Sequence, residues 1–340
     1  MKKEYKIGII PGDGIGRDVV GAAHRVLATI SGMSEEFKLV FFKMDAGESA
    51  VEKCGNPLPK ETLDGIAKMD AALFGASHTP PVIAGLRHGF HLYAKVCPVK
   101  AWPGTDAIRP SADLIIVREN TEGLYRGIGY IDREHHVNLR IFTTKGMERI
   151  IRFCFDLAVK RGRKKVTFTH KAPVLKHTDG PMMEIFYEIA KQYPGIGAED
   201  MMVDACAMTM IMKPEKLDIL LVENANGDIL SDVGAAITGG LGLAPSGNIG
   251  DSMAIFEPIH GTAPKYAGKN IVNPIATIMA GKMMLDYLGE TAAGSCLEKA
   301  VKDVLVEGKI KTYDLGGNSS TTEVADAISD KIVKNWNGKV

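Results

Sequence analysis

Two acidic side chains, Asp228 and Asp232, stand four residues apart in the segment Asn224-Ala-Asn-Gly-Asp-Ile-Leu-Ser-Asp232. In a helix that starts at the glycine, both project from one face, where like charges repel. Helix stability therefore does not explain the pair. A hard divalent cation does, because Mg²⁺ and Mn²⁺ take oxygen ligands and are usually held by one or two carboxylates plus substrate oxygens. The spacing predicts a metal site.

Strong cations stand near the ends of predicted strands, at Arg87, Arg118 and Lys171. Ligands of α/β proteins gather at strand ends, and the arginine fork matches a carboxylate. These residues favour a di- or tricarboxylic acid as ligand. Lys171 and Tyr125 near one metal can divide proton transfers between them. Asp204 is a third candidate carboxylate, with the alternative role of capping the segment that follows it.

Two glycine-containing segments suggest cofactor contacts. The first, Gly12-Asp-Gly-Ile-Gly16, follows a predicted strand and opens a helix, but the dinucleotide fingerprint needs its third glycine one residue later. It is interpreted either as a dinucleotide turn or as a plain tight turn. The second, Glu257–Gly268, combines a histidine, hydroxyls, a lysine and a tyrosine, which are able to hold a ribose, an adenine and a phosphate.

Short strands alternate with helical stretches, which predicts an α/β layered fold with a mostly parallel sheet. The predicted strands are 6–10, 37–43, 71–75, 114–118, 166–170, 201–203 and 219–223. The predicted helices are 16–31, 60–68, 145–161, 180–192, 231–239, 275–288, 296–307 and 321–335. The segment 125–142 is strand-like and polar, so we expect an arm that pairs with a partner subunit. The methionines, dense between 182 and 212, are interpreted as core filler.

Composition narrows the class of protein. The chain has 340 residues, enough for two domains, and its 41 basic and 41 acidic residues balance. Nothing favours nucleic acid or an acidic membrane as partner, and no apolar run is long enough to predict a transmembrane helix. The basic N-terminus runs directly into a predicted strand and is not interpreted as a signal peptide. Five scattered cysteines predict reduced thiols in a cytoplasmic protein.

Together these motifs resemble the β-decarboxylating dehydrogenases, the family of isocitrate, 3-isopropylmalate and homoisocitrate dehydrogenases. The resemblance covers essentially the whole chain. It implies a two-domain, three-layer α/β subunit with a mixed sheet that is not a true Rossmann fold. The expected domains are a large cofactor-binding domain, 1–100 plus 250–340, and a small domain, 101–249, with the dimerisation arm and the metal and substrate residues. It also implies homodimers or homotetramers with shared active sites.

The resemblance implies a role for each motif residue. Asp228 and Asp232 would bind Mg²⁺ or Mn²⁺, with Asp204 supplied by the neighbouring subunit. Lys171, also from the neighbour, would take the substrate's hydroxyl proton, and Tyr125 would protonate the enol carbon after CO₂ leaves. The substrate-binding residues would be Arg87, Arg118, Ile83 and Cys97. NADP or NAD would contact Thr79, Asn224, His260, Gly261, Thr262, Ala263, Lys265, Tyr266, Asn273 and Tyr313.

Three departures from the family pattern bear on the substrate. Cys97 replaces a second clamp arginine, and we expect Lys95 to lie on the other face of the strand, where it would not replace that charge. Pro173 replaces an asparagine that usually sits near substrate and nicotinamide. Pro81 and Ile83 stand where isocitrate enzymes often carry serine and asparagine, and Ile83 would leave a carboxylate poorly solvated. An apolar substituent, as in 3-isopropylmalate, fits better.

The cofactor loop favours a different relative. Ala-Pro-Lys265-Tyr266-Ala-Gly resembles NADP-using isocitrate enzymes, and Lys265, Tyr266 and Tyr313 could bind a 2′-phosphate. An arginine expected after Tyr313 is missing. We expect oxidative decarboxylation of a 3-substituted malate by hydride transfer to NAD or NADP, with 3-isopropylmalate the favoured substrate. The alternatives are an isocitrate or homoisocitrate dehydrogenase, a D-malate or tartrate dehydrogenase, and a regulatory paralogue without turnover.

Overall fold

The computed structural model describes residues 2–336 of the chain. They form two compact units. The first lies within Met1–Leu92, Ala101–Pro110 and Thr238–Val340, and the second consists of Tyr93–Lys100 and Ser111–Ile237. The middle of the chain therefore supplies most of the second unit, while the segments on both sides of it build the first.

The first unit contains strands in the order β2-β1-β3-β12-β11. β1, β2, β3 and β12 pair in parallel, whereas β11 is antiparallel to β12. The strands are β1 (Lys3–Gly12), β2 (Phe37–Lys43), β3 (Ala71–Ala76), β11 (Pro245–Ile249) and β12 (Ala254–Pro258). The helices are α1 (Gly16–Met33), α2 (Glu48–Cys54), α3 (Lys60–Ile66), α4 (Val82–Gly89), α9 (Ile275–Leu288), α10 (Thr291–Glu307) and α11 (Thr321–Asn335).

Helix α9 lies at the centre of this unit. It packs against α1, α10 and strands β3, β11 and β12, so nearly its whole circumference is buried. Its sequence is correspondingly apolar on every side. Helix α1 is amphipathic instead, because Val19, Val26 and Ile30 face the core while the opposite side stays open to solvent. α1 therefore presents a buried face and an accessible face within one unit.

The second unit contains strands in the order β4-β5-β10-β8-β9. β4 is antiparallel to β5, and the remaining neighbours are parallel. All four residues of β10 are buried, as expected for a strand whose sheet is covered by helices on both faces. The strands are β4 (Ala94–Lys100), β5 (Asp113–Glu119), β8 (Lys165–His170), β9 (Gly197–Met202) and β10 (Ile219–Val222). The helices are α5 (Thr144–Arg161), α6 (Asp179–Ala190), α7 (Val203–Met212) and α8 (Asn224–Ile237).

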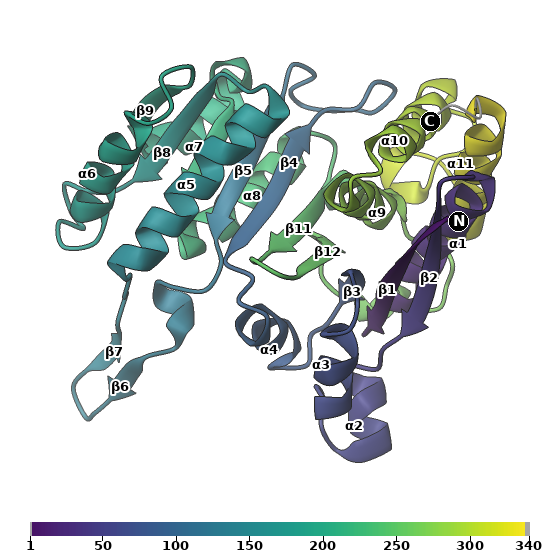
Figure 1. The fold of residues 1–340 in the computed structure, drawn as a ribbon, viewed down its shortest axis with the longest axis horizontal. Helices are drawn as coiled ribbons and strands as arrows, with labels where there is room; N and C mark the ends of the chain where they lie inside the picture. Colours follow the sequence, from purple (N-terminus) through teal and green to yellow (C-terminus); the bar gives the residue numbers. More distant parts are fainter. Residues whose placement is uncertain (1, 337–340) are drawn as a thin grey trace. The chain divides into compact units, whose positions relative to one another are not determined.

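The predicted arm forms a short antiparallel hairpin, β6 (Gly129–Ile131) and β7 (His136–Asn138), which projects away from the rest of the second unit (Figure 1). Its apolar residues Tyr130 and Ile131 are 57% and 77% exposed. In residues 2–336 no helix is both long and apolar enough to cross a membrane.

The α/β class with a mixed sheet is confirmed, and most predicted elements lie within a few residues of those observed. Strand 37–43 and helices 275–288 and 321–335 were predicted with the observed bounds. Helix α8 begins at Asn224, earlier than expected, and strand β9 begins at Gly197. Helices α2, α4 and α7 and strands β4, β11 and β12 were not predicted. Several of these are short, so periodicity gives little signal for them.

Candidate active site

Arg118, at the end of β5, is the centre of the candidate site in the second unit. Its side chain is only 1% exposed. Nε and Nη2 donate hydrogen bonds to Asn224 Oδ1 at 3.0 and 2.7 Å. The Asn224 amide is itself buried and donates to the Glu122 carbonyl at 3.2 Å. The guanidinium is therefore held in one orientation by an amide from the first turn of α8.

Helix α8 can approach this arginine because residue 227 is glycine. A Cβ at Gly227 would lie 2.7 Å from Arg118 Cγ, too close for any other residue. The start of the helix is capped by Glu223, whose carboxylate accepts hydrogen bonds from the backbone N–H groups of Asn226 at 2.7 Å and Ala225 at 3.2 Å. Starting at Asn224, the helix carries Asp228 and Asp232 on one accessible face.

The two aspartates have different surroundings. Asp228 Oδ1 accepts a hydrogen bond from Arg118 Nη1, and Oδ2 accepts one from the Tyr125 hydroxyl at 2.7 Å. Burial raises the pKa of Asp228, but the charge of Arg118 and these bonds outweigh burial and lower it. Burial and the neighbouring Asp228 charge raise the pKa of Asp232. A divalent cation relieves that repulsion, so the donor pair fits Mg²⁺ or Mn²⁺.

Lys95 corrects one expectation from the sequence. Residues two apart in a strand share a face, so Lys95 and Cys97 point the same way along β4. Lys95 is opposite Arg118 in the antiparallel register, and Cys97 is opposite Ile116. Lys95 is 6% exposed. Its charge contributes to the lowered pKa of Asp228, and at Asp232 it opposes the larger upward effects of burial and Asp228. The expectation that it points to the other face is wrong. A second buried cation therefore stands beside the aspartate pair.

Lys171 and Asp204 form a separate pair in the second unit. Lys171 Nζ lies 2.9 Å from Asp204 Oδ1. The N-cap of α7 is Met202, so the alternative capping role for Asp204 is wrong. Among residues 2–336 no three acidic, histidine or cysteine side chains form a group that could hold a metal. Asp204 therefore does not join Asp228 and Asp232 within one chain.

The histidine before Lys171 holds this strand end in place. His170 Nε2 is 2.9 Å from Asp200 Oδ2, and Nδ1 is 3.0 Å from the Ala172 N–H. Because Nδ1 accepts from that amide, the ring proton lies on Nε2 and is donated to Asp200. The Lys171 backbone N–H donates to Asp179 at 2.7 Å.

In the first unit, the glycine-rich turn is built around Asp13, whose role the sequence did not reveal. This carboxylate is fully buried and accepts hydrogen bonds from the Glu48 N–H and from Ser77 and Thr79. Burial raises its pKa, but these bonds outweigh burial and lower it. The backbone N–H groups of Asp13 and Ile15 donate to the Ala76 and Thr262 carbonyls. Because those amides are occupied, the structure favours the tight-turn interpretation over a phosphate cradle.

The predicted cofactor residues of the first unit gather in two places. Thr79 bonds to Asp13, as described above. Tyr266 and Tyr313 rings lie 5.6 Å apart, and Lys265 Nζ is 4.8 Å from the centre of the Tyr266 ring. Lys265, together with the hydrogen bond to Tyr313, lowers the pKa of Tyr266. The Asn273 amide donates to Asp314, next to Tyr313, at 3.0 Å.

His260 gives a test of whether this loop fits a cofactor. Its Nδ1 lies 3.0 Å from the Gly261 carbonyl and donates to it, which leaves Nε2 as an acceptor. Nε2 is buried and has no hydrogen-bond partner among the residues described. Burial also lowers the pKa of His260, which keeps the ring neutral. A buried acceptor without a donor fits a hydroxyl group of a bound nucleotide.

Three predicted substrate residues lie outside the cluster around Arg118 and Asp228. Arg87 Nη2 lies 3.5 Å from Glu257 Oε1 in the first unit. Ile83 packs against the buried apolar cluster that includes Val82 and Leu86. Cys97 is fully buried in β4. Their roles toward a substrate stay predictions.

Comparisons with known proteins identify the family to which this chain belongs. The family described as isocitrate/isopropylmalate dehydrogenase matches residues 6–328, and the chain belongs to this family of oxidoreductases. It is 47% identical to 3-isopropylmalate/3-methylmalate dehydrogenase of Methanocaldococcus jannaschii, over 96% of this chain and 99% of the relative. It is 43% identical to homoisocitrate dehydrogenase of the same organism, over 98% of this chain and 99% of the relative.

A solved structure gives the same result for the fold. The crystal structure of isocitrate dehydrogenase from Methylococcus capsulatus superposes with a TM-score of 0.91 at 44% identity, covering 96% of this chain and 99% of that one. The resemblance inferred from the motifs is therefore confirmed, and so is the predicted fold class.

Proposed function

We propose that this protein catalyses the oxidative decarboxylation of a 3-substituted malate, with 3-isopropylmalate as the favoured substrate. The observation that carries the proposal is the cluster around Asp228, where a buried arginine, a tyrosine hydroxyl and a second aspartate meet. Each group matches one requirement of the reaction: a carboxylate clamp, a proton donor and a metal ligand pair.

Asp228 and Asp232 would hold Mg²⁺ or Mn²⁺, which would supply Lewis-acid stabilisation of the substrate's developing oxyanion, and bound NAD or NADP would supply the hydride acceptor. Tyr125 holds a proton on its hydroxyl, because burial and then the bond to Asp228 raise its pKa. It therefore stays protonated at neutral pH and is available to protonate the enol carbon. Arg118 and Lys95 are cations for the substrate's carboxylates.

Lys171 is the proposed proton acceptor for the substrate hydroxyl. In the structure its Nζ lies 2.9 Å from Asp204 Oδ1, so Asp204 is its counter-ion. Because Asp204 lies apart from the aspartate pair of its own chain, we infer that both residues serve the site of a neighbouring subunit.

Exposed apolar side chains support assembly into a homodimer or homotetramer. Met208 and Met212 on α7 are 62% and 59% exposed, and Ile229 on α8 is 65% exposed. The interpretation of the methionines as core filler is wrong for Met208 and Met212. Exposed apolar residues on two helices that pack together, along with the arm, are typical of a subunit interface.

The choice of substrate rests on the pocket residues and the choice of cofactor on the loop. Ile83 supplies apolar surface and favours an alkyl substituent. Cys97, in place of a clamp arginine, weakens the hold on a carboxylate, which keeps D-malate and tartrate among the alternatives. The alternative substrates isocitrate and homoisocitrate carry an extra carboxylate, and Lys95 is the cation that would favour them. Lys265 beside Tyr266 and Tyr313 favours NADP over NAD.

The test is an assay of the purified protein with Mn²⁺ and either NAD⁺ or NADP⁺. We expect reduction of the nicotinamide with 3-isopropylmalate, and slower reduction with isocitrate, homoisocitrate and D-malate. Fastest turnover of isocitrate would overturn the pocket argument but keep the reaction. No reduction with any of the four acids would leave a regulatory paralogue as the function.

A further inference from the structure

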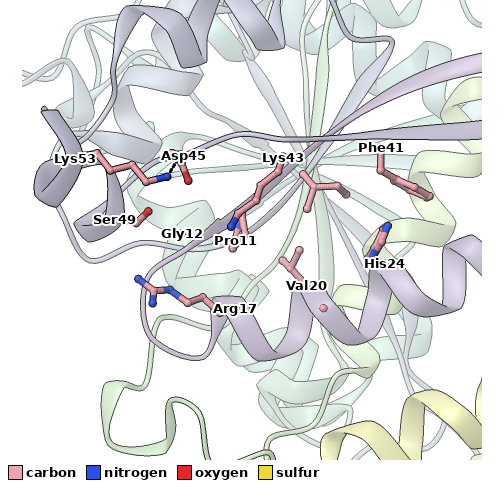
Figure 2. A pocket seen from close by; sticks show the side chains of 12 residues that line it. Pro11, Gly12, Arg17, Val20, His24, Phe41, Lys43, Asp45, Ser49 and Lys53 are labelled. Atoms are coloured by element: carbon pink, nitrogen blue, oxygen red, sulfur yellow. Dashed lines mark hydrogen bonds and ion pairs between the residues drawn. The ribbon is translucent and has the colours of Figure 1, made fainter.

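A cavity of about 550 Å³ lies in the first unit, between α1 and the ends of β1 and β2 (Figure 2). Its size is within the range of small-molecule sites, roughly 300–1,000 Å³. Its floor is apolar, with Ile9, Pro11, Val20 and Phe41. The rim is polar and carries Arg17, Lys43, Asp45, Ser49 and Lys53. An apolar floor with a few polar groups at its edge is typical of a ligand site.

Strand register and a glycine create the space. Ile9 is paired with Lys43 and Ile7 with Phe41, so Phe41 and Lys43 share the face of the sheet that α1 covers. Opposite them, α1 presents Gly21 in the middle of the helix. A Cβ added there would meet no atom within 4 Å. Glycine in a helix interior weakens the helix, and here it leaves the cavity open.

The rim has an excess of positive charge. Lys53 is paired with Asp45. Arg17 and Lys43 also line the cavity, and both are exposed at its mouth; neither has an ion pair within residues 2–336. Three cations and one carboxylate leave two positive charges, which suits a dianion. Parallel strands also present ligands at their carboxyl ends, where Lys43 and Asp45 stand.

No residue of the predicted cofactor loop lines this cavity. Ile15 and Val19 form an apolar cluster with Ala263 and Tyr266 of that loop. The cavity is lined by Arg17, Val20, Gly21 and His24, which lie on the opposite side of α1 at 100° per residue. Arg17 also lines a pocket beside Pro264 and Gly268 of that loop, so the two places share this side chain and differ in the other α1 residues that line them.

We propose that the cavity binds a nucleoside 5′-monophosphate. The base packs on the aromatic rings of Phe41 and His24, which lie 4.4 Å apart in an edge-to-face arrangement. The Asp45 carboxylate accepts hydrogen bonds from ribose hydroxyls, and Arg17 and Lys43 bind the phosphate. This inference does not rest on the proposed function, because binding needs no turnover.

The experiment measures AMP binding to the full-length protein by titration calorimetry, with adenosine and inorganic phosphate as partial probes. We expect AMP to bind at least about tenfold more tightly than either probe, since one charge-assisted contact is worth that much. Lys43→Gln should weaken AMP about tenfold. Gly21→Leu, which fills the cavity, should abolish AMP binding. Gly21→Ala should raise the melting temperature and keep most of the AMP affinity.

A cofactor-loop variant separates the two sites. Tyr266→Ala should leave AMP affinity unchanged, and saturating NADP⁺ should not displace AMP. Loss of AMP binding in Tyr266→Ala with full binding in Gly21→Leu would assign AMP to the cofactor loop and overturn the proposal. No AMP binding by the wild type would overturn it too. So would a change of oligomeric state in Gly21→Leu, since the cavity would then be a contact between copies.

Discussion

Asp13 and Asp228 are both aspartates that lie next to a glycine at the start of a helical segment, but their surroundings differ. Asp13 is fully buried, and its oxygens accept hydrogen bonds from backbone and hydroxyl groups of two loops. Asp228 is half-exposed and is bonded to two side chains, Arg118 and Tyr125. A buried carboxylate such as Asp13, whose hydrogen bonds are all made within the protein, stabilises the fold. A half-exposed carboxylate such as Asp228, which lies beside a second negative charge, can bind a ligand.

The largest expected effect is that of Asp228→Asn. Loss of one ligand charge should lower kcat/KM with Mn²⁺ by about 10³-fold, because electrostatic stabilisation of the oxyanion dominates such reactions. The melting temperature should change little, since Asp228 is only half-buried. Steady-state assays and a Mn²⁺ titration measure both quantities. Asp251→Asn, at an exposed position, is the matched control. Retained turnover in the Asp228 variant would show that the metal binds elsewhere.

Tyr125→Phe tests the proton donor of the same cluster. The ring stays over Arg118, whose Cζ is 5.1 Å from its centre, so the variant removes only the hydroxyl. We expect kcat to fall by roughly 10²-fold, the lower range for a general acid, with unchanged affinity for Mn²⁺. Stopped-flow kinetics and metal titration check this pair of results. An unchanged kcat would remove Tyr125 from the reaction.

Asp13→Asn should affect stability more than chemistry. Replacing the carboxylate by an amide places an NH₂ donor against N–H and hydroxyl groups that are themselves donors. The free energy of unfolding should fall by about 2–3 kcal/mol. Because its folded pKa lies below the ordinary 3.8, the carboxylate's contribution is complete above that value and is lost as pH falls through the folded pKa. Urea unfolding should therefore show a difference between variant and wild type at pH 7 that shrinks in acid. A stable but inactive variant would instead place Asp13 in the binding site.

Lys95→Met gives the smallest expected effect. Removing this cation should raise KM for the hydroxy acid about tenfold, the value of one charge-assisted contact. Affinity for Mn²⁺ should stay the same or increase, because a positive charge leaves the neighbourhood of the aspartates. Lys95→Arg keeps the charge and is the control. Weaker Mn²⁺ binding in Lys95→Met would mean that the lysine positions the aspartates rather than the substrate.

The local pattern of apolar residues predicted most of the longer helices and strands but missed several short ones. The helix 275–288 and the strand 37–43 have strong apolar patterns and were located with the observed bounds. Helix α4, eight residues long, carries Arg87 and was missed because so few residues show little periodicity. Lys95 was assigned to the wrong face of β4, although strand parity alone would have placed it correctly.

Residue types and their spacing were enough to identify the family, because the aspartate pair, the cations and the order of the motifs can all be read from the sequence. Tertiary structure alone decided how these groups are held. Asn224 fixes Arg118 from 106 residues away, and Gly227 admits the helix that makes this possible. Neither contact has a local signature, since nothing in the spacing of two distant segments states which of their side chains meet. The same reason hid the role of Asp13 and the cavity beside Gly21 until the chain was folded.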